Sequence, residues 1–349
     1  MEYRNLGDSG LRVSSFCLGA MMFGPGANED PAECARIVQR CLDAGINFFD
    51  TADAYGRGES ERILGLALRG RRARALIATK LWFPMGRDPN QRGASRRRIV
   101  QACEDSLRRL GTDWIDLYQL HRIDPDTELD EQLAALSDLV RQGKLRAIGT
   151  STARAEQIVE CHWTAERRGL VRVRSEQPPY SIFTRGVEAA VLPTCRRYGM
   201  GTLVWSPLNG GWLAGRYRRD APPPAGSRAA RQFFDPRWWD RARAPVQRKL
   251  ELLDALARLA REQGCSLAQL SLAFPLAHPA VSSVILGPRT LEQCEELLAR
   301  ADLRLPAAVL DAIDALVPPG TDLDPIDTLQ LAPALEASAR RRPRDAAAC

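Results

Sequence analysis

The stretch GINFFDTADAYGRGESERILGLALRGRRARALIATK, residues 45–80, contains one complete repeat of the pattern that decides the fold. It begins with a short apolar run that ends at Asp50, and it continues through a polar loop into a helical segment at 60–68. Gly70 follows that segment, as glycine commonly does just past the end of a helix. A second apolar run at 76–80 completes the repeat. The stretch therefore predicts a strand, a loop, a helix and a strand in succession.

The same alternation extends along the chain in both directions. Short apolar runs predict eight strands, at residues 15–18, 47–50, 76–80, 115–120, 147–150, 173–177, 202–205 and 283–286. Helical segments bounded by Pro or Gly lie between them, at residues 31–44, 60–68, 95–110, 130–142, 155–168, 187–198 and 291–300. Strict alternation indicates a parallel sheet. Eight units in a chain of 349 residues favour an α/β fold of the (β/α)8 TIM-barrel type over an open, doubly wound sheet.

Two segments interrupt the alternation. Residues 4–6 and 11–13 flank a Gly-Asp-Ser-Gly turn, which predicts an N-terminal β-hairpin that closes the bottom of the barrel. Residues 209–245, after the seventh strand, are rich in Gly, Pro, Arg and Trp and are too long for an ordinary connection, so we expect an active-site loop there. We expect one barrel domain over residues 1–317 and a partly disordered tail over residues 318–349.

Composition and charge exclude several classes of protein. Hydrophobic residues at 45% and charged residues at 26% are typical of a globular chain. The net charge of +6 comes from arginines spread along the chain, and the one basic run, at 340–344, is interpreted as a solvated tail, so no nucleic-acid partner is expected. No apolar run reaches the roughly 20 residues needed to span a bilayer, and the N-terminus has no signal-peptide core. We therefore expect no membrane partner.

Cysteine and histidine usage bears on the compartment and on metals. The nine cysteines include no C-x-x-C pair, which favours a reducing, cytoplasmic location. None of the three histidines has metal-ligand spacing from another histidine or a cysteine pair, so no metal is expected.

Four polar residues follow consecutive predicted strands, at the end where barrel enzymes place their reactive groups. Asp50 ends the second strand, Lys80 ends the third, His121 follows the fourth, and Tyr55 lies in the loop after Asp50. An ammonium beside a phenol lowers the pKa of the phenol, and a carboxylate holds the ammonium in place. Tyr55 would then protonate a carbonyl oxygen that His121 orients. Taken singly, each residue could equally be a cap, an ion-pair partner or a structural group; their consecutive positions favour catalysis.

Seven motifs, in order, give the chain a resemblance to a known family: LGAMMFG at 18–24, GINFFDTADAYG at 45–56, ATKLW at 78–82, DLYQLHR at 116–122, AIGTST at 147–152, WSPLNGGWLAGRY at 205–217 and VILGPRTLEQCEEL at 284–297. The chain resembles the aldo-keto reductases, from about Tyr3 to Arg300. The resemblance implies a catalytic tetrad of Asp50, Tyr55, Lys80 and His121. No side chain releases hydride, so a reductase needs a cofactor as the hydride donor. The resemblance implies that this cofactor is NADPH and that the substrate is a small aldehyde or ketone.

The same resemblance implies where the cofactor binds. Ser151, Thr152 and Gln177 match the positions that hold the nicotinamide carboxamide, although Thr152 stands where Asn or Arg is more usual. Trp205 matches the aromatic residue that stacks on the nicotinamide ring, although it could instead be a barrel-core tryptophan. The pyrophosphate loop corresponds to Ser206, Pro207, Leu208, Gly210 and Arg216, whose backbone N–H groups and guanidinium suit an anion.

The adenosine end is implied to lie after the eighth strand. Gly287-Pro288-Arg289 opens a helix whose N-terminus suits a phosphate, and Arg289 is the expected contact for the 2′-phosphate, which favours NADPH over NADH. Gln293 and Glu296 match adenosine contacts, whereas Leu297 stands where the family usually has Asn. The remaining expected contacts are Ala20, Met21 and Asp50. No G-x-G-x-x-G motif opens a helix after a strand, so a Rossmann domain is not supported.

An alternative function and the substrate remain open. The chain also resembles the potassium-channel β proteins, which share the barrel and carry Asn at the position of His121, so a cofactor-binding regulatory subunit is the rival interpretation. The substrate pocket is expected to be lined by Met22, Trp82, Phe83, His121, Phe233, Phe234, Trp238 and Trp239. Arginines of the long loop, such as Arg218, Arg219 and Arg231, would suit a phosphorylated or nucleotide-linked keto sugar. The pattern of strands and helices does not determine the oligomeric state, so a homo-oligomer stays an open alternative.

Overall fold

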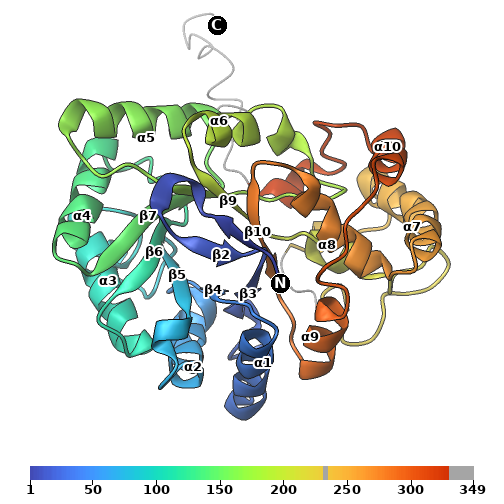
Figure 1. The fold of residues 1–349 in the computed structure, drawn as a ribbon, viewed down its shortest axis with the longest axis horizontal. Coiled ribbons are helices and arrows are strands. Elements are labelled where there is room, and N and C mark those ends of the chain that lie inside the picture. Colours follow the sequence, from blue (N-terminus) through green and yellow to red (C-terminus); the bar gives the residue numbers. More distant parts are fainter. Residues whose placement is uncertain (231–234, 330–349) are drawn as a thin grey trace, which may run out of the picture.

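Eight parallel strands close into a barrel in the computed structural model, which describes residues 1–230 and 235–329 (Figure 1). The barrel order is β10-β3-β4-β5-β6-β7-β8-β9, so each strand pairs with its neighbours in sequence and the last strand pairs with the first. The barrel strands are β3 (Phe16–Gly19), β4 (Phe48–Asp50), β5 (Leu76–Leu81), β6 (Ile115–Leu120), β7 (Leu145–Ser151), β8 (Ser175–Gln177), β9 (Gly201–Val204) and β10 (Val281–Leu286). The predicted (β/α)8 fold is confirmed.

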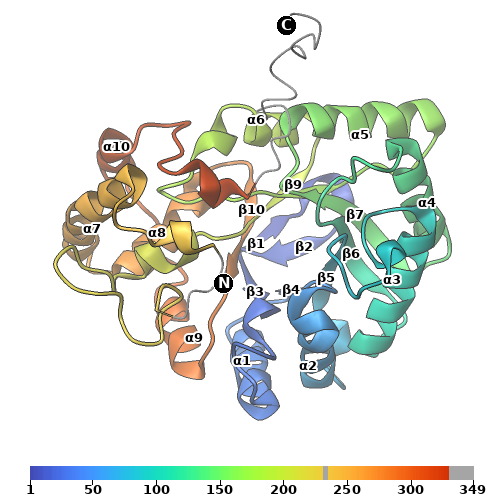
Figure 2. The same ribbon diagram turned by 180° about the vertical axis from the view of Figure 1, so that it is seen from behind.

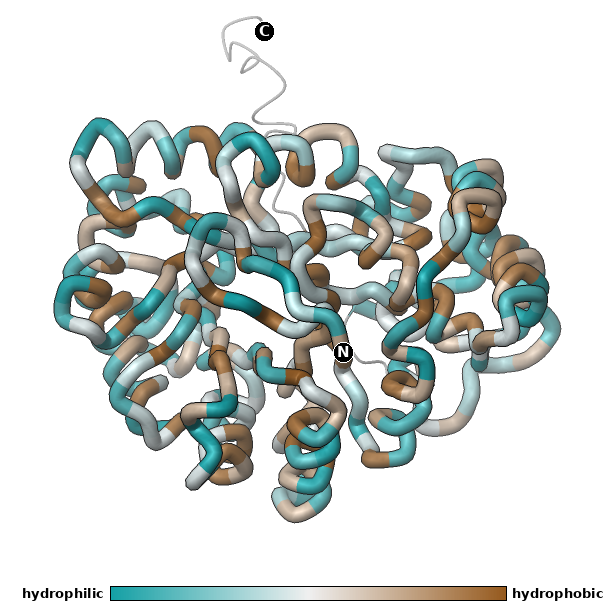
Figure 3. Tube along the Cα trace, viewed as in Figure 1, coloured by the Kyte–Doolittle hydropathy of each residue, from teal (hydrophilic) through white to brown (hydrophobic). Residues whose placement is uncertain are grey.

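Helices surround the barrel in both views (Figures 1 and 2). They are α1 (Pro31–Asp43), α2 (Glu59–Ala67), α3 (Arg96–Leu110), α4 (Leu129–Arg141), α5 (Ala155–Arg168), α6 (Val191–Arg197), α7 (Ala244–Glu262), α8 (Leu267–Ala277), α9 (Leu291–Leu298) and α10 (Ala307–Leu316). Hydrophobic and hydrophilic residues alternate along the helices (Figure 3), as expected when one side of each helix packs on the barrel. The main core lies between these helices and the strands.

Local sequence explains where the predicted helices begin and end. Asp30 caps α1 by accepting a hydrogen bond from the Ala32 amide at 2.8 Å, and Pro31 occupies the first helical position, where no N–H is needed. Gly111 ends α3 in the left-handed conformation, at φ 63°.

Three helices, α7, α8 and α10, were not among the predicted helical segments. The sequence of α8, LAQLSLAFPLA, is apolar along most of its length and contains Pro275, so it has no polar face to reveal a helical period. Helices α7 and α8 both lie between β9 and β10, and α7 begins where the long loop ends. In its described residues, the loop predicted over 209–245 contains the short 3-10 turns η7 (Asn209–Ala214) and η8 (Pro236–Trp238) and, at its end, the start of α7. Residues 231–234 lie outside the described residues.

The predicted N-terminal hairpin is present and fills one end of the barrel. Strands β1 (Tyr3–Asn5) and β2 (Arg12–Ser14) pair antiparallel. Leu6 and Val13 are fully buried, in one cluster with the barrel-interior residues Cys17, Phe48, Ala78, Leu117, Ala147 and Leu203. Gly7 in the turn lies so close to the chain before β9 that a Cβ atom would sit 2.3 Å from the Gly199 carbonyl oxygen. Only glycine permits that approach.

The first part of the predicted tail packs on the barrel. Residues 318–329 include the 3-10 turn η9 (Pro325–Thr328), and Arg185 donates from its backbone N–H to the Thr321 carbonyl oxygen at 2.9 Å. Residues 330–349 lie outside the described residues, so the predicted disorder there stays a prediction. Within the described part of the chain, no helix combines the length and the apolarity that crossing a membrane requires.

Candidate active site

A fully buried lysine occupies the end of β5, at the rim of the barrel. The Lys80 side chain is 0% exposed, and its Nζ donates to Asp50 Oδ2 at 2.5 Å and to the Thr51 carbonyl oxygen at 2.8 Å. Asp50 ends β4, the neighbouring strand, and its Oδ1 accepts from Gln177 Nε2 at 2.8 Å. Burial lowers the pKa of Lys80, but Asp50 and Tyr55 outweigh burial, and the net pKa is raised. The ammonium is therefore charged at neutral pH.

Tyr55 and His121 lie beside this ion pair. Lys80 Nζ is 5.1 Å from the centre of the Tyr55 ring, and the Tyr55 and His121 rings meet edge to face with centres 5.8 Å apart. Burial, Lys80 and Arg122 together hold the pKa of His121 well below its usual range. His121 is therefore a neutral imidazole, and its Nδ1 is buried without a hydrogen-bond partner among the described residues. The structure thus brings Asp50, Tyr55, Lys80 and His121 to one point.

The pKa of Tyr55 differs from the sequence-based expectation. We expected Lys80 to lower it, but burial raises it and the Asp50 charge adds to that, while Lys80 lowers it only in part. The reason is that the phenolate would lose almost all of its hydration in this site. Tyr55 is therefore firmly protonated and available as a proton donor.

Most of the predicted cofactor residues line one cavity of about 430 Å³, which also contains Tyr55 and His121. They come from several loops at the same rim of the barrel: Met21, Asp50, Ser151, Thr152, Gln177, Trp205, Ser206, Pro207, Leu208, Gly210, Arg216, Gly287, Arg289, Gln293 and Glu296. Ala20 does not line the cavity; it is fully buried, and its carbonyl oxygen accepts from Ser60 Oγ at 2.6 Å. Its predicted contact stays a prediction.

Unusual backbone conformations cluster on this cavity. Thr152 and Ser206 both have φ of +56°, and Gly210 and Gly211 have φ of +67° and +110°. A non-glycine residue with positive φ is strained and is found where the surrounding structure enforces it, often at functional sites. Ser206 Oγ accepts from the Gly210 amide at 2.9 Å, which fixes the turn after β9. The loop after β9 therefore has a defined shape that faces the cavity.

Comparison with known proteins decides the family. The model of the aldo/keto reductase family matches residues 15–318.

The chain belongs to the aldo/keto reductase family.

Two relatives illustrate the range of this family. One is a probable voltage-gated potassium channel subunit beta from Oryza sativa subsp. japonica, 39% identical over 323 residues, covering 91% of this chain and 97% of the relative. Another is the uncharacterized oxidoreductase YrpG from Bacillus subtilis, 38% identical over 331 residues, covering 91% of this chain and 96% of the relative. Family membership supports oxidoreductase activity on carbonyl compounds.

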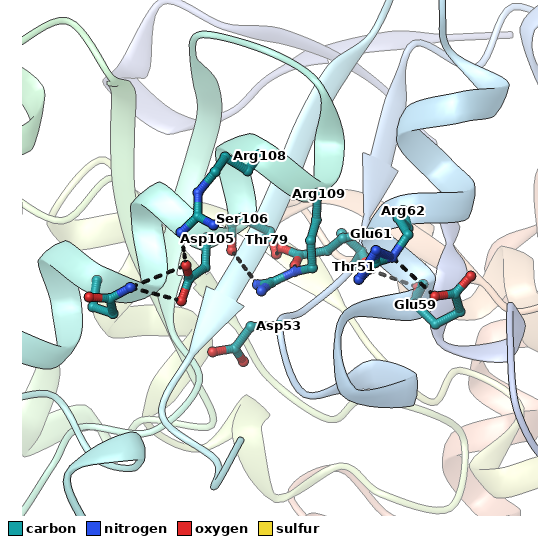
Figure 4. Close-up of polar contacts among 12 residues, drawn as sticks. Thr51, Asp53, Glu59, Glu61, Arg62, Thr79, Asp105, Ser106, Arg108 and Arg109 are labelled. Atoms are coloured by element: carbon teal, nitrogen blue, oxygen red, sulfur yellow. Dashed lines mark hydrogen bonds and ion pairs between the residues drawn. The ribbon is translucent and has the colours of Figure 1, made fainter. Parts of the chain in front are cut away.

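Behind the tetrad of this aldo/keto reductase, a buried polar cluster joins α2, α3 and β5 (Figure 4). Glu61 lies between two partners, accepting from Thr79 Oγ1 and from Arg109 Nε, each at 2.6 Å. Thr51, whose carbonyl oxygen binds Lys80, has its hydroxyl 2.9 Å from Ser60 Oγ. Sequence reasoning missed this cluster because the partners lie on separate helices and strands and no short motif links them.

Asp53 anchors the loop that connects Asp50 to Tyr55. Its Oδ2 accepts from Arg98 of α3 at 2.5 Å, and its amide donates to the Lys80 carbonyl oxygen at 3.1 Å. Burial raises the pKa of Asp53 to about 7, although Arg98 opposes this effect. The loop is thus tied both to β5 and to α3, which holds Tyr55 beside Lys80.

The predicted substrate-pocket residues divide into three groups. Met22, Phe83, His121 and Trp238 line the cavity. Trp82 and Trp239 do not line it; Trp239 packs against Trp212 instead, with ring centres 5.2 Å apart. Phe233, Phe234 and Arg231 lie outside the described residues. Arg218 and Arg219 are exposed and do not line the cavity, whereas the unpredicted Arg122, Tyr217, Gly226, Arg228 and Leu329 do.

Proposed function

We propose that this protein reduces an aldehyde or ketone to an alcohol with NADPH, using Tyr55 as the general acid. One observation carries the proposal: a fully buried ammonium, Lys80, bonds to Asp50 and faces the ring of Tyr55, and both partners line a cavity that also contains Arg289. At the rim of a barrel, a buried ammonium beside a phenol can support proton transfer from that phenol to a bound substrate.

The cavity residues fit a dinucleotide with phosphates. Two arginines, Arg216 and Arg289, line it away from the tetrad, and the glycine turn at 210–211 leaves room for an anion to approach the backbone. In our proposal Ser151, Thr152 and Gln177 hold the nicotinamide end beside Asp50. Trp205 covers its ring, and Ser206, Pro207, Leu208, Gly210 and Arg216 hold the pyrophosphate. Met21, Gly287, Gln293 and Glu296 complete the site. When bound, NADPH supplies the hydride.

The tetrad supplies the proton and positions the carbonyl. Tyr55, whose pKa burial raises, stays protonated until a carbonyl oxygen gains negative charge, and it then donates its phenolic proton to that oxygen. Lys80 stabilises the phenolate that is left, and Asp50 keeps Lys80 in place. His121 is neutral and donates a hydrogen bond to the same oxygen from one ring nitrogen.

Preference for NADPH over NADH is assigned to Arg289. Its side chain lines the cavity and, among the described residues, forms no ion pair with a carboxylate. Its backbone N–H donates to Gln293 Oε1 at 2.9 Å, which fixes the turn before α9. An anchored arginine with an unneutralised guanidinium suits a phosphate monoester, the group that distinguishes NADPH from NADH.

A second candidate function is that of a cofactor-binding regulatory subunit. It is favoured by the relatives named as probable potassium channel β subunits. In that case the cofactor would bind without useful turnover. We favour the enzyme because the ring of His121 lies against Tyr55 and lines the cavity, which gives the site its second hydrogen-bond donor. A cytoplasmic location is also proposed, because the eight cysteines of the described residues are free thiols.

The test follows the absorbance of NADPH, with NADH beside it, against a panel of aromatic aldehydes, simple ketones and keto sugars. The wild type is compared with Tyr55→Phe, and cofactor binding is measured separately by fluorescence titration. Oxidation of NADPH that disappears in the variant while NADPH still binds supports the reductase. Tight NADPH binding with no turnover across the panel, or turnover that survives the loss of Tyr55, rules out the proposed mechanism and favours the regulatory subunit.

A further inference from the structure

Arg122 has a buried guanidinium to which the described residues offer no carboxylate partner. The residue is 8% exposed, and its guanidinium donates to two backbone carbonyl oxygens, those of His121 at 2.5 Å and Leu329 at 3.3 Å. Within residues 1–230 and 235–329, it takes part in no ion pair. Burying a charge without an opposite charge is costly, so buried arginines are normally neutralised.

The other buried arginines follow that rule. Arg98 pairs with Asp53 at 2.5 Å, and Arg185 pairs with Glu188 at 2.9 Å and with Asp314 at 2.7 Å. Both are 4% exposed, so Arg122 differs from them in its partners and not in its burial. Burial lowers the pKa of Arg122, with only the more distant Glu176 and Tyr55 opposing this effect.

Arg122 lies at the tetrad end of the cavity. It lines the cavity together with Tyr55, His121 and Phe83, and its Cζ is 5.7 Å from the centre of the Phe83 ring. The Phe83 and His121 rings are in turn in edge-to-face contact, with centres 4.7 Å apart. The Phe83 ring therefore contacts both the Arg122 guanidinium and the His121 imidazole, which would orient the carbonyl.

The other charges of the cavity do not neutralise Arg122. The cavity contains two acidic residues, Asp50, which is held by Lys80, and Glu296, which lies on α9 with the proposed adenosine contacts. Three further arginines, Arg216, Arg228 and Arg289, also line the cavity. Within the described residues, the carboxylates that line the cavity therefore form no ion pair with Arg122.

We propose that Arg122 binds an anionic group, a carboxylate or a phosphate, on the carbonyl substrate, and so determines the substrate class. This inference rests on the proposed reductase function. The substrate is then a carbonyl compound whose anionic group binds Arg122 while its carbonyl oxygen is placed between Tyr55 and His121. Arginine suits this role because its planar guanidinium can make two parallel hydrogen bonds to either anion.

The experiment compares matched aldehydes with the wild-type enzyme and NADPH. Benzaldehyde is neutral, 4-carboxybenzaldehyde adds a carboxylate, and 4-formylphenyl phosphate adds a phosphate. The variants are Arg122→Met, which removes the charge, and Arg122→Lys, which keeps the charge but loses the fork of donors. Arg300→Met is the matched control, because the Arg300 guanidinium also donates to a backbone carbonyl oxygen, that of Gly264 at 2.9 Å, but does not line the cavity.

We expect the wild type to have a higher kcat/KM for at least one anionic aldehyde than for benzaldehyde. In Arg122→Met, the ratio of anionic to neutral kcat/KM should fall by about 10- to 100-fold, as expected for the loss of a charge-assisted bidentate contact. Arg122→Lys should retain part of the preference, and Arg300→Met all of it. The anionic aldehyde whose kcat/KM falls more in Arg122→Met shows whether carboxylate or phosphate is the preferred group.

An equal loss for anionic and neutral aldehydes in Arg122→Met overturns the inference, because it shows that Arg122 only holds the segment at Leu329 in place. A wild type that prefers benzaldehyde also overturns it. Binding of benzoate and phenyl phosphate by isothermal titration calorimetry gives a readout that needs no turnover. Arg122-dependent binding without any aldehyde reduction would support the anion site and count against the proposed function. Turnover without Arg122-dependent binding would support the proposed function and count against the anion site.

Discussion

Two fully buried lysines in this protein each pair with an aspartate, but the two pairs have different surroundings. Lys80 Nζ is 2.5 Å from Asp50 Oδ2, and Lys249 Nζ is 2.6 Å from Asp327 Oδ2. Both lysine side chains are 0% exposed. The first pair is at the rim of the barrel below the cavity, whereas the second joins α7 to the turn η9.

The pKa of the two lysines moves in opposite directions. Burial lowers both, but Asp50 and Tyr55 raise the pKa of Lys80 above its usual value, whereas Asp327 does not compensate fully and the pKa of Lys249 is lowered. Asp327 also accepts from Asn209 Nδ2 at 3.0 Å, which ties the loop after β9 to the C-terminal segment. The Lys80–Asp50 pair thus differs from the Lys249–Asp327 pair in having a titratable third partner, Tyr55, that lines the cavity.

The largest effect is expected from Lys80→Met. Without the ammonium, Tyr55 loses the charge that would stabilise its phenolate, so kcat should fall by about 10³- to 10⁴-fold. The measurement is single-turnover reduction of the best aldehyde of the panel. Lys249→Met serves as the control, because it also removes a buried ammonium. Comparable kcat losses in the two variants would show that burial of the pair, not its position, controls activity.

Lys249→Met should mainly reduce stability. The substitution leaves the buried Asp327 without its cation, so the free energy of unfolding should fall by about 3–5 kcal/mol, as measured by urea denaturation. The double variant Lys249→Met with Asp327→Leu removes both charges and should recover most of that loss. If the double variant is no more stable than the single one, the pair is not the source of the effect.

A buried acid without a cation in contact extends the comparison to pH. Glu176 is 0% exposed and accepts from Thr150 Oγ1 at 2.5 Å and from the Ala153 amide at 3.0 Å; burial raises its pKa to about 7. Because the folded state then holds a proton that the unfolded state has lost, Glu176 contributes less stability as pH rises from about 4.5 to about 7.

Glu176→Gln removes this titration. The stability of the wild type relative to the variant should therefore fall by up to about 3 kcal/mol between pH 5 and pH 8. The measurement is urea denaturation of both proteins across that range. A difference that is constant with pH would mean that Glu176 is ionised throughout.

The smallest effect is expected at the far end of the cavity. Arg289→Met should reduce the preference for NADPH over NADH by about tenfold, or about 1.4 kcal/mol, because the lost contact is one partly solvated phosphate. The measurement is the ratio of the two cofactor dissociation constants by fluorescence titration. An unchanged ratio of dissociation constants would show that Arg289 does not discriminate between NADPH and NADH.

Much of the site could be predicted because a closed parallel barrel brings the ends of its strands to one rim. Asp50 ends β4, His121 follows β6 and Lys80 is the last residue but one of β5, so their sequence positions were enough to predict that they meet. The orientation of loop residues could not be predicted in this way. Of the neighbours Trp82 and Phe83, for example, Phe83 lines the cavity and Trp82, whose φ is an unusual +145°, does not.

The sequence by itself determined the alternation of strands and helices, the hairpin and the residues at the strand ends, because these depend on local periodicity and on short turn signals. Only the tertiary structure decided the partners of the buried charges. Arg98 and Asp53 are paired, whereas no carboxylate in the described part of the chain pairs with Arg122. It also decided that the pKa of Tyr55 is raised. The physical reason is that burial and a nearby opposite charge shift a pKa in opposite directions over a few ångströms, between residues that are far apart in the chain.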